Sequence, residues 1–160
     1  MYKIDKIDCQ IVDLLMIDGR MSASEIARKM GKISERVVRY RIERMVAEGV
    51  IRVCAIPDPK VLGFSVVADV FIEADANMIQ EVAEQLLSYE FISYVACSIG
   101  ENDISVQVIA RNSDDVYRYA TDVIGKIPGV RKTTTSIVPI TLKDIFEWKI
   151  PASVWQNSVE

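Results

Sequence analysis

The sequence predicts an α+β fold, with a helical N-terminal third followed by a region in which strands and helices alternate. Two patterns support this. Apolar residues up to about residue 49 recur at steps of three and four, which is the period of a helix. From residue 64 onward, runs rich in Val, Ile and Thr alternate with helical patterns. The 160 residues suffice for one or two small domains, and half of them are apolar.

The first two helices are marked by their start and stop signals. One helix is expected over 4–17, where Ile and Leu residues fall on one face, and Gly19 follows as a stop. Ser22, with Glu25 three residues later, is a capping-box pattern, so a second helix starts there and ends at Gly31.

A third helix follows after a short turn that contains glycine. Ser34 is its expected N-cap, and Gly49 ends it. Val38, Ile42 and Met45 lie at i, i+4 and i+7 and predict its buried stripe. Three short helices with a tight turn between the second and third predict a helix-turn-helix.

The period changes after residue 49. VIRVCAI is β-like and is followed by two prolines, so 50–63 is read as a strand plus linker. Strands are then expected over 64–75, 91–99, 103–110 and 130–142, with helices over 77–88 and 114–126. This βαββαβ order is ferredoxin-like. The predicted domains are a helix-turn-helix at 1–52, a linker strand at 53–63, a ferredoxin-like domain at 64–142 and a tail at 143–160.

Charge is distributed unevenly along this acidic chain. The formal net charge is −4, yet residues 1–60 hold 12 Lys+Arg against 9 Asp+Glu, and residues 61–160 hold 7 against 14. The third helix carries four arginines in SERVVRYRIERM. A basic segment on an acidic protein indicates either a solvated helix face or a surface for an anionic partner such as double-stranded DNA.

Composition argues against several other classes. The chain has no histidine and three widely spaced cysteines without a CxxC pair, so no metal site, cofactor or catalytic residue is expected. No apolar run approaches the ~20 residues of a membrane span. The N-terminus is too charged for a signal peptide. We therefore expect a cytoplasmic protein with no membrane partner.

Three stretches carry a resemblance to a known family. IDKIDCQIVDLLMIDGRMSASEIARKM, SERVVRYRIERMVAEGVIRVCAIPDPKVLG and SIGENDISVQV together resemble the Lrp/AsnC, or feast/famine, transcription regulators. The resemblance covers roughly residues 3–142. It implies an N-terminal winged helix-turn-helix that binds DNA. It also implies a C-terminal βαββαβ domain that dimerises, assembles dimers into tetramers or octamers, and often binds an amino acid between subunits.

The third helix supplies the DNA-binding candidates. An Arg fork can bond guanine O6 and N7 in the major groove, and other basic side chains neutralise phosphates. Residues near the start of the helix reach bases most easily. The base-reading candidates are Ser34, Glu35, Arg36, Arg39 and Tyr40. Arg41 and Arg44 are assigned to phosphate contact or to internal bracing, and the sequence leaves both roles open for Arg41.

The effector candidates lie on a predicted loop. The family's loop is typically Gly-x-(aromatic)-Asp, and here it is Gly100, Glu101, Asn102 and Asp103, so the aromatic residue is lost. Backbone groups at Gly100 could meet a ligand carboxylate, Asp103 could pair with its ammonium, and Thr134 could add a hydroxyl. An ordinary hairpin loop explains the same residues.

Two further alternatives remain open at this stage. The regulator could have lost effector sensing, because the loop is altered. An enzyme resembling sirohaem decarboxylases is the rival class, but that resemblance relies on histidine, which the chain lacks. In the tail, Trp148 and Trp155 are expected to pack on the same chain or on a neighbouring subunit, since tryptophan supplies large buried area.

Overall fold

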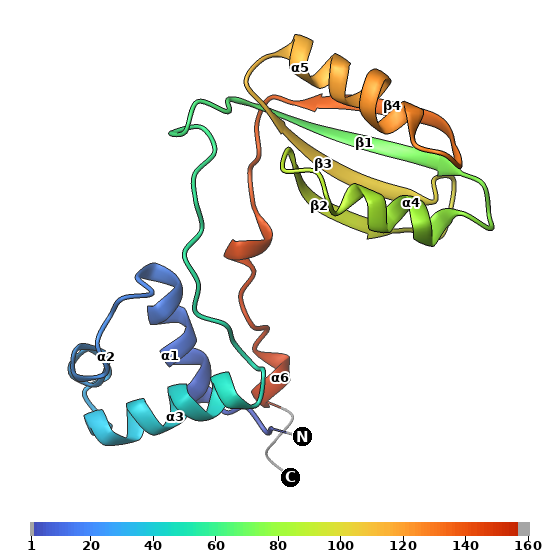
Figure 1. Cartoon of the computed structure of the whole chain (residues 1–160). Helices are drawn as coiled ribbons and strands as arrows, with labels where there is room; N and C mark the ends of the chain where they lie inside the picture. Colours follow the sequence, from blue (N-terminus) through green and yellow to red (C-terminus); the bar gives the residue numbers. More distant parts are fainter. Residues whose placement is uncertain (1, 157–160) are drawn as a thin grey trace. The chain divides into compact units, whose positions relative to one another are not determined.

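The structure is a computed structural model that describes residues 2–156 (Figure 1). The chain forms two compact units. One contains the residues up to Ile56 together with the C-terminal segment from Lys143, and the other spans Pro57–Leu142. None of the helices in the described part of the chain is long and apolar enough to cross a membrane.

Three helices build the N-terminal unit, and all three were expected. They are α1 (Lys6–Ile17), α2 (Ala23–Met30) and α3 (Glu35–Ala47). The side chains of Ser22 and Ser34 cap α2 and α3 by accepting backbone N–H bonds. Gly31 ends α2 with φ +67°, a left-handed conformation that glycine adopts without strain. The sequence reading missed the N-cap of α1, where Asp5 and Asp8 form a reciprocal capping box.

A small apolar core holds these helices together. Ile11, Ile26, Val38 and Met45 are fully buried in it, and Ile42 packs against them partly buried. The expected stripe of α3 therefore faces inward. Buried apolar side chains of this size each contribute about 1.5–3 kcal/mol relative to exposure. The buried stripe therefore decides which side of α3 faces the core and which side faces solvent.

The strand expected within 50–63 is not formed, so this expectation was wrong. No strand is found among residues 2–65, and a β-wing is therefore absent from the described N-terminal unit. A strand needs a hydrogen-bonded neighbour, and this segment has none within its own chain. The N–H groups of Val50 and Ile51 instead bond the Met45 carbonyl at the end of α3.

The second unit has the expected βαββαβ order. Its elements are β1 (Val66–Ala74), α4 (Ile79–Leu86), β2 (Ile92–Cys97), β3 (Ile104–Ala110), α5 (Ser113–Arg118) and β4 (Val130–Val138). A π-helical turn at Tyr119–Val123 and a 3-10 turn at Ile124–Lys126 extend α5. The strand order is β2-β3-β1-β4 with antiparallel neighbours.

Several boundaries differ from the sequence prediction, most by one or two residues, and two of the differences have a clear local cause. β4 ends at Val138 rather than at Leu142, because the next residue, Pro139, has no N–H to donate to the ladder. α5 begins at Ser113 itself, and its N-cap is Asn112, whose side chain accepts the N–H of Asp115 at 2.8 Å.

One face of this sheet is covered and the other is open. Alternate residues of β1, from Ala68 to Ala74, are buried in one core with residues of α4 and α5, including Val82, Leu86 and Val116. Figure 1 shows both helices on the same side of the sheet. The intervening residues of β1, such as Phe71, face the open side and are only partly buried.

The C-terminal tail returns to the N-terminal unit. It contains a 3-10 turn, η3 (Ile145–Glu147), and a short helix, α6 (Ser153–Gln156). Ile150 packs against the helical core, and the Lys6 ammonium lies 5.7 Å from the centre of the Trp155 ring. Trp155 thus packs on the same chain, one of the two arrangements expected, whereas Trp148 stays 56% exposed.

Candidate DNA-binding surface and effector site

The exposed side of α3 carries the base-reading candidates. Opposite its buried stripe, Arg36, Arg39 and Tyr40 are exposed, and Tyr40 keeps 59% of its surface accessible. Ser34 and Glu35 lie at the start of the helix, where they are exposed as well. The Arg39 guanidinium pairs with Glu35 one turn earlier, and this ion pair restricts the orientation of the Arg39 side chain. We define the exposed arc of α3 as Arg36, Arg39 and Tyr40.

Arg41 does not belong to this arc. Its guanidinium turns toward α1 and bonds the carboxylates of Asp5 and Asp8 at 2.8 and 2.7 Å. Only 23% of its side chain is accessible. These ion pairs match internal bracing, one of the two roles that the sequence left open. Arg44 is exposed, and its guanidinium lies 5.0 Å from the centre of the Tyr2 ring.

The effector candidates are brought only partly together. Gly100, Glu101 and Asn102 form the loop between β2 and β3, and Asp103 closes it. The Asp103 carboxylate accepts the backbone N–H of Ala74 at 2.8 Å and lies 3.9 Å from the Arg131 guanidinium. Asp103 is therefore engaged within its own chain, and Arg131 is a neighbour that the sequence reading missed.

Thr134 lies apart from this loop. It is exposed on the edge strand β4 and pairs in register with Phe71 of β1. Because β1 separates β4 from β3, Thr134 is one strand removed from the strand that the loop enters. A ligand that touches both Asp103 and Thr134 of one chain would have to cross β1 on the open face.

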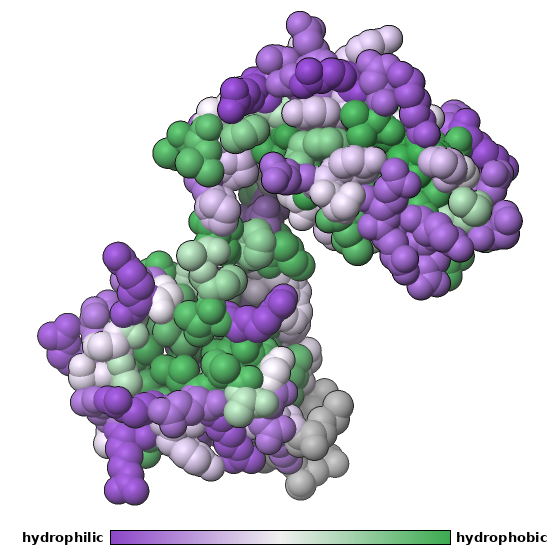
Figure 2. All heavy atoms as spheres, viewed as in Figure 1, coloured by the Kyte–Doolittle hydropathy of each residue, from purple (hydrophilic) through white to green (hydrophobic). Residues whose placement is uncertain are grey.

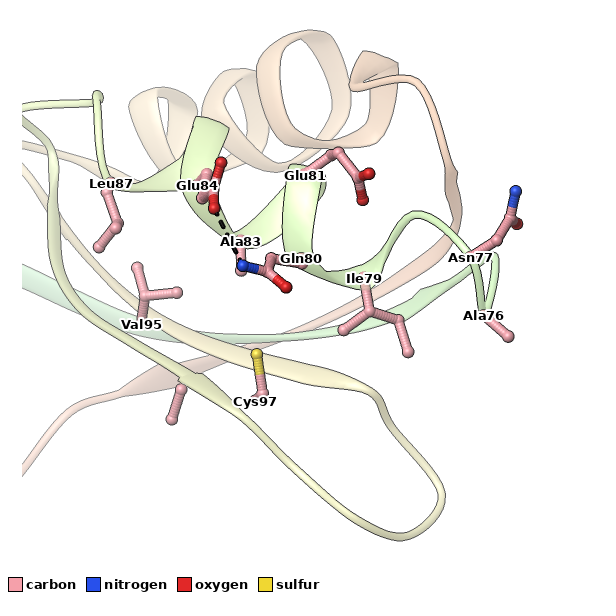
Figure 3. Close-up of a pocket in the computed structure, with 11 residues that line it drawn as sticks. Ala76, Asn77, Ile79, Gln80, Glu81, Ala83, Glu84, Leu87, Val95 and Cys97 are labelled. Atoms are coloured by element: carbon pink, nitrogen blue, oxygen red, sulfur yellow. Dashed lines mark hydrogen bonds between the residues drawn. The ribbon is translucent and has the colours of Figure 1, made fainter.

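A groove lies elsewhere on this unit, between α4 and β2 (Figure 3). It has a volume of about 670 Å³. Ile79, Ala83 and Leu87 of the α4 region form its apolar wall, and Gln80 and Glu84 bond each other at 3.2 Å beside it. No effector candidate lines it. The wall residues follow an i, i+4, i+8 spacing along the helix, and Ile79 and Ala83 also pack against the core.

Metal-binding clusters and cysteines were the remaining groups to place. No group of three His, Cys, Asp or Glu side chains there is placed to hold a metal ion. Cys9 is buried, and burial together with nearby Asp8 raises the pKa of its thiol, which keeps it protonated. Cys54 and Cys97 are free and exposed.

Comparison with known proteins decides the family. The AsnC-type helix-turn-helix domain matches residues 4–46, and the Lrp/AsnC ligand binding domain matches residues 65–147. The chain belongs to the Lrp/AsnC family. These two matches place α3 in the DNA-binding module of the family, and the loop at Gly100–Asp103 in its ligand-binding module.

Individual Lrp/AsnC relatives agree with this assignment. The HTH-type transcriptional regulator FL11 of Pyrococcus abyssi is 37% identical over 92% of this chain and 97% of its own length. The regulator LrpA of Pyrococcus horikoshii is 36% identical over 88% and 99%. Among solved structures, AsnC of E. coli is 26% identical, with a TM-score of 0.80 over 93% of this chain and 99% of that chain. This Lrp/AsnC protein is therefore a DNA-binding transcription regulator with a ligand-binding domain.

Proposed function

We propose that this regulator reads double-stranded operator DNA with the exposed arc of α3 and that its function is regulation rather than catalysis. The observation that carries the proposal is the placement of Arg36, Arg39 and Tyr40 on the outer side of the second helix of a helix-turn-helix. Arg forks recognise guanine in the major groove, and Tyr40 adds a hydroxyl and an aromatic surface. Arg44 and the basic residues of α2 supply phosphate contacts. Cytoplasmic location is part of the same proposal.

The operator-binding form is proposed to be a dimer or a larger assembly. The open face of the sheet presents Phe71, Ile109 and Tyr94 around a polar pair in which the Gln107 amide bonds Asp69 at 3.2 Å. A face that mixes aromatic and aliphatic side chains with paired polar groups is typical of subunit interfaces. Tyr94 and Ile137 are among the large apolar side chains that are exposed in this unit. Figure 2 shows hydrophobic residues at the surface of the protein. Two-fold pairing would present two copies of α3 to two half-sites.

An amino-acid-type effector is proposed to bind at the loop Gly100–Asp103 with the help of a neighbouring subunit. The loop is largely exposed, and Ile99 beside it is completely accessible. One chain supplies only one side of such a site. Glu101 and Asn102 make the loop polar, so polar or basic amino acids are the first effectors to test.

A second candidate, an effector-independent regulator, is favoured by one specific observation. Asp103 already accepts a backbone N–H and lies near Arg131, so its charge is partly compensated without a ligand. In this alternative the loop is a structural hairpin, and occupancy of the operator follows protein concentration alone.

Selection of bound fragments from random-sequence DNA, with and without pooled amino acids, tests these proposals. We expect a roughly palindromic site and at least a dimer in sedimentation velocity. One class of amino acid should change both the operator affinity and the sedimentation profile. A selected site without two-fold symmetry, bound by a monomer, contradicts the assembly. If no amino acid at millimolar concentration changes DNA affinity, sedimentation or thermal stability, the effector-independent regulator takes the place of the effector proposal.

A further inference from the structure

We propose that Arg41 is a positioning residue for operator recognition, because its ion pairs with Asp5 and Asp8 fix the rotation of α3 about its own axis. This inference rests on the proposed function of the exposed arc. It assigns to an arginine in the middle of the recognition helix a role that requires no contact with DNA.

The ion pairs are part of a closed network. Arg41 Nη1 donates to Asp5 Oδ2 and to Asp8 Oδ1. The other oxygen of Asp8, Oδ2, accepts the Tyr2 hydroxyl at 2.9 Å and the Asp5 backbone N–H at 3.1 Å. The Asp8 side chain is 1% exposed. Both oxygens of this buried carboxylate are thus satisfied, as a buried charge requires.

This arrangement keeps Arg41 away from phosphates. To reach DNA, its guanidinium would have to leave two carboxylates, one of which would remain buried without a counter-charge. Removing one partner of a buried ion pair is strongly unfavourable, and a phosphate contact at the protein surface offers much less. Opposing effects act on its pKa: burial lowers it, and the bonds to Asp8 and Asp5 raise it above the ordinary value.

The network restrains a motion that the apolar core restrains poorly. Apolar contacts of Val38 and Met45 are non-directional, so they tolerate small rotations of α3. A guanidinium nitrogen that donates charge-assisted hydrogen bonds to two carboxylates is directional. Side chains reach about 5–6 Å from a helix axis, so a rotation of about 10° moves their ends by about 1 Å. That displacement exceeds the tolerance of a hydrogen bond to a base edge.

Tyr2 closes the network from the N-terminal side. Its hydroxyl donates to Asp8, and its ring lies under the Arg44 guanidinium, so one aromatic residue contacts both α1 and α3. Burial, reinforced by the bond to Asp8, raises the pKa of Tyr2 to about 12, so the hydroxyl remains a donor at neutral pH. The segment before α1 therefore contributes to the orientation of the recognition helix.

The test compares two substitutions that change charge identically. Asp5→Asn removes one acceptor of Arg41 at a half-exposed position, where the fold should survive. Asp13→Asn, exposed on α1, is the matched control. Each removes one negative charge, which alone favours DNA. We expect Asp5→Asn to lower the ratio of operator affinity to random-DNA affinity about tenfold, and Asp13→Asn to leave this ratio unchanged. Equal ratios in both variants would overturn the proposal.

A salt series separates positioning from phosphate contact. A lost phosphate contact reduces the slope of log affinity against log salt by ~0.9 and weakens operator and random DNA alike. Arg41→Gln, which removes the charge and the bonds to both carboxylates, is expected to weaken operator binding more than random-DNA binding, with the slope unchanged. A reduced slope, or equal weakening on both DNAs, would overturn the proposal.

Hydrogen exchange without DNA keeps this inference distinct from the proposed function. Asp5→Asn should speed exchange of α3 amides relative to those of α2, and Asp13→Asn should not. If the wild-type protein fails to distinguish operator from random DNA, the proposed function fails. In that case the exchange rates of the α3 amides still decide whether the network holds this helix. Unchanged exchange rates in Asp5→Asn refute the positioning role of Arg41.

Discussion

The carboxylate of Asp103 accepts a hydrogen bond from the backbone N–H of Ala74 across 2.8 Å. This bond joins the loop before β3 to the end of β1, where Ala74 is 1% exposed. The Asp103 side chain, which was expected to bind a ligand, thus also satisfies a buried backbone N–H at the end of β1. A substitution at Asp103 therefore has two effects that must be separated.

Asp103→Ala is expected to lower the stability of the second unit as well as any effector response. It leaves the buried N–H of Ala74 without its partner, which costs about 1–3 kcal/mol. Asp103→Asn keeps an acceptor and removes only the charge, so it should be less destabilising and should still abolish an ammonium contact. Chemical denaturation and effector titration of both variants measure the two effects. Equal stability of the Ala variant and the wild type contradicts the bracing role.

Arg36→Ala and Arg39→Ala should each weaken operator binding by about 1–3 kcal/mol if each makes a bidentate base contact. The helix should persist, because both side chains are exposed and lie opposite the buried stripe. Fluorescence anisotropy at a fixed salt concentration measures the affinity. Arg118→Ala, an exposed arginine of α5 paired with Asp115, is the matched control and should bind normally. Unchanged affinity in both test variants excludes base reading by this arc.

Glu35→Gln should relax the choice of DNA sequence. Glu35 holds the Arg39 guanidinium on the helix surface, and its negative charge opposes phosphates. Without this charge, affinity for random DNA should rise more than affinity for the operator. Competition binding with both DNAs gives the ratio. An exposed pair of this kind contributes only about 0.3–0.5 kcal/mol to stability, so the melting temperature should hardly change. A higher preference for the operator would contradict this role.

The contribution of Asp5 to stability should disappear in acid. Burial raises the pKa of this carboxyl, but bonds from the Asp8 N–H and the Arg41 guanidinium outweigh it and hold the pKa below the ordinary 3.8. A lowered folded-state pKa means that the stabilisation is complete above about 3.8 and is lost as the pH falls through the folded-state value. The difference in unfolding free energy between the wild type and Asp5→Asn should thus be constant from pH 7 to 5 and shrink below pH 4. A difference that grows in acid has the wrong sign.

The fragment 57–142 is expected to fold alone. It contains a complete sheet with its two covering helices and its own apolar core. A helical fragment that ends at residue 56 should be less stable than the same helices in the full chain, because it lacks the contacts of Ile150 and Trp155. Circular dichroism of both fragments, with Trp148→Ala in the full chain as an exposed-residue control, tests the division. An unfolded 57–142 fragment contradicts this domain boundary.

Local signals in the sequence determined most of the secondary structure. Caps at Ser22 and Ser34, the stop at Gly31 and the stripe of Val38, Ile42 and Met45 each depend on residues within one or two turns, so they are readable without a fold. The βαββαβ order followed in the same way from alternation of period. The family resemblance rested on the same ordered motifs, and the exposed arc of α3 followed from the helix period.

Contacts between distant residues were decided only by the tertiary structure. Arg41 meets Asp5 and Asp8 more than thirty positions away, and no local pattern distinguishes a bracing arginine from a DNA-binding one. Likewise, Asp103 finds Ala74 and Arg131 through the strand register. Residues 50–56 are β-like in composition yet form no strand, because a strand depends on a partner rather than on its own residues. Propensity acts within a segment, whereas ion pairs and ladders depend on which segments the fold brings together.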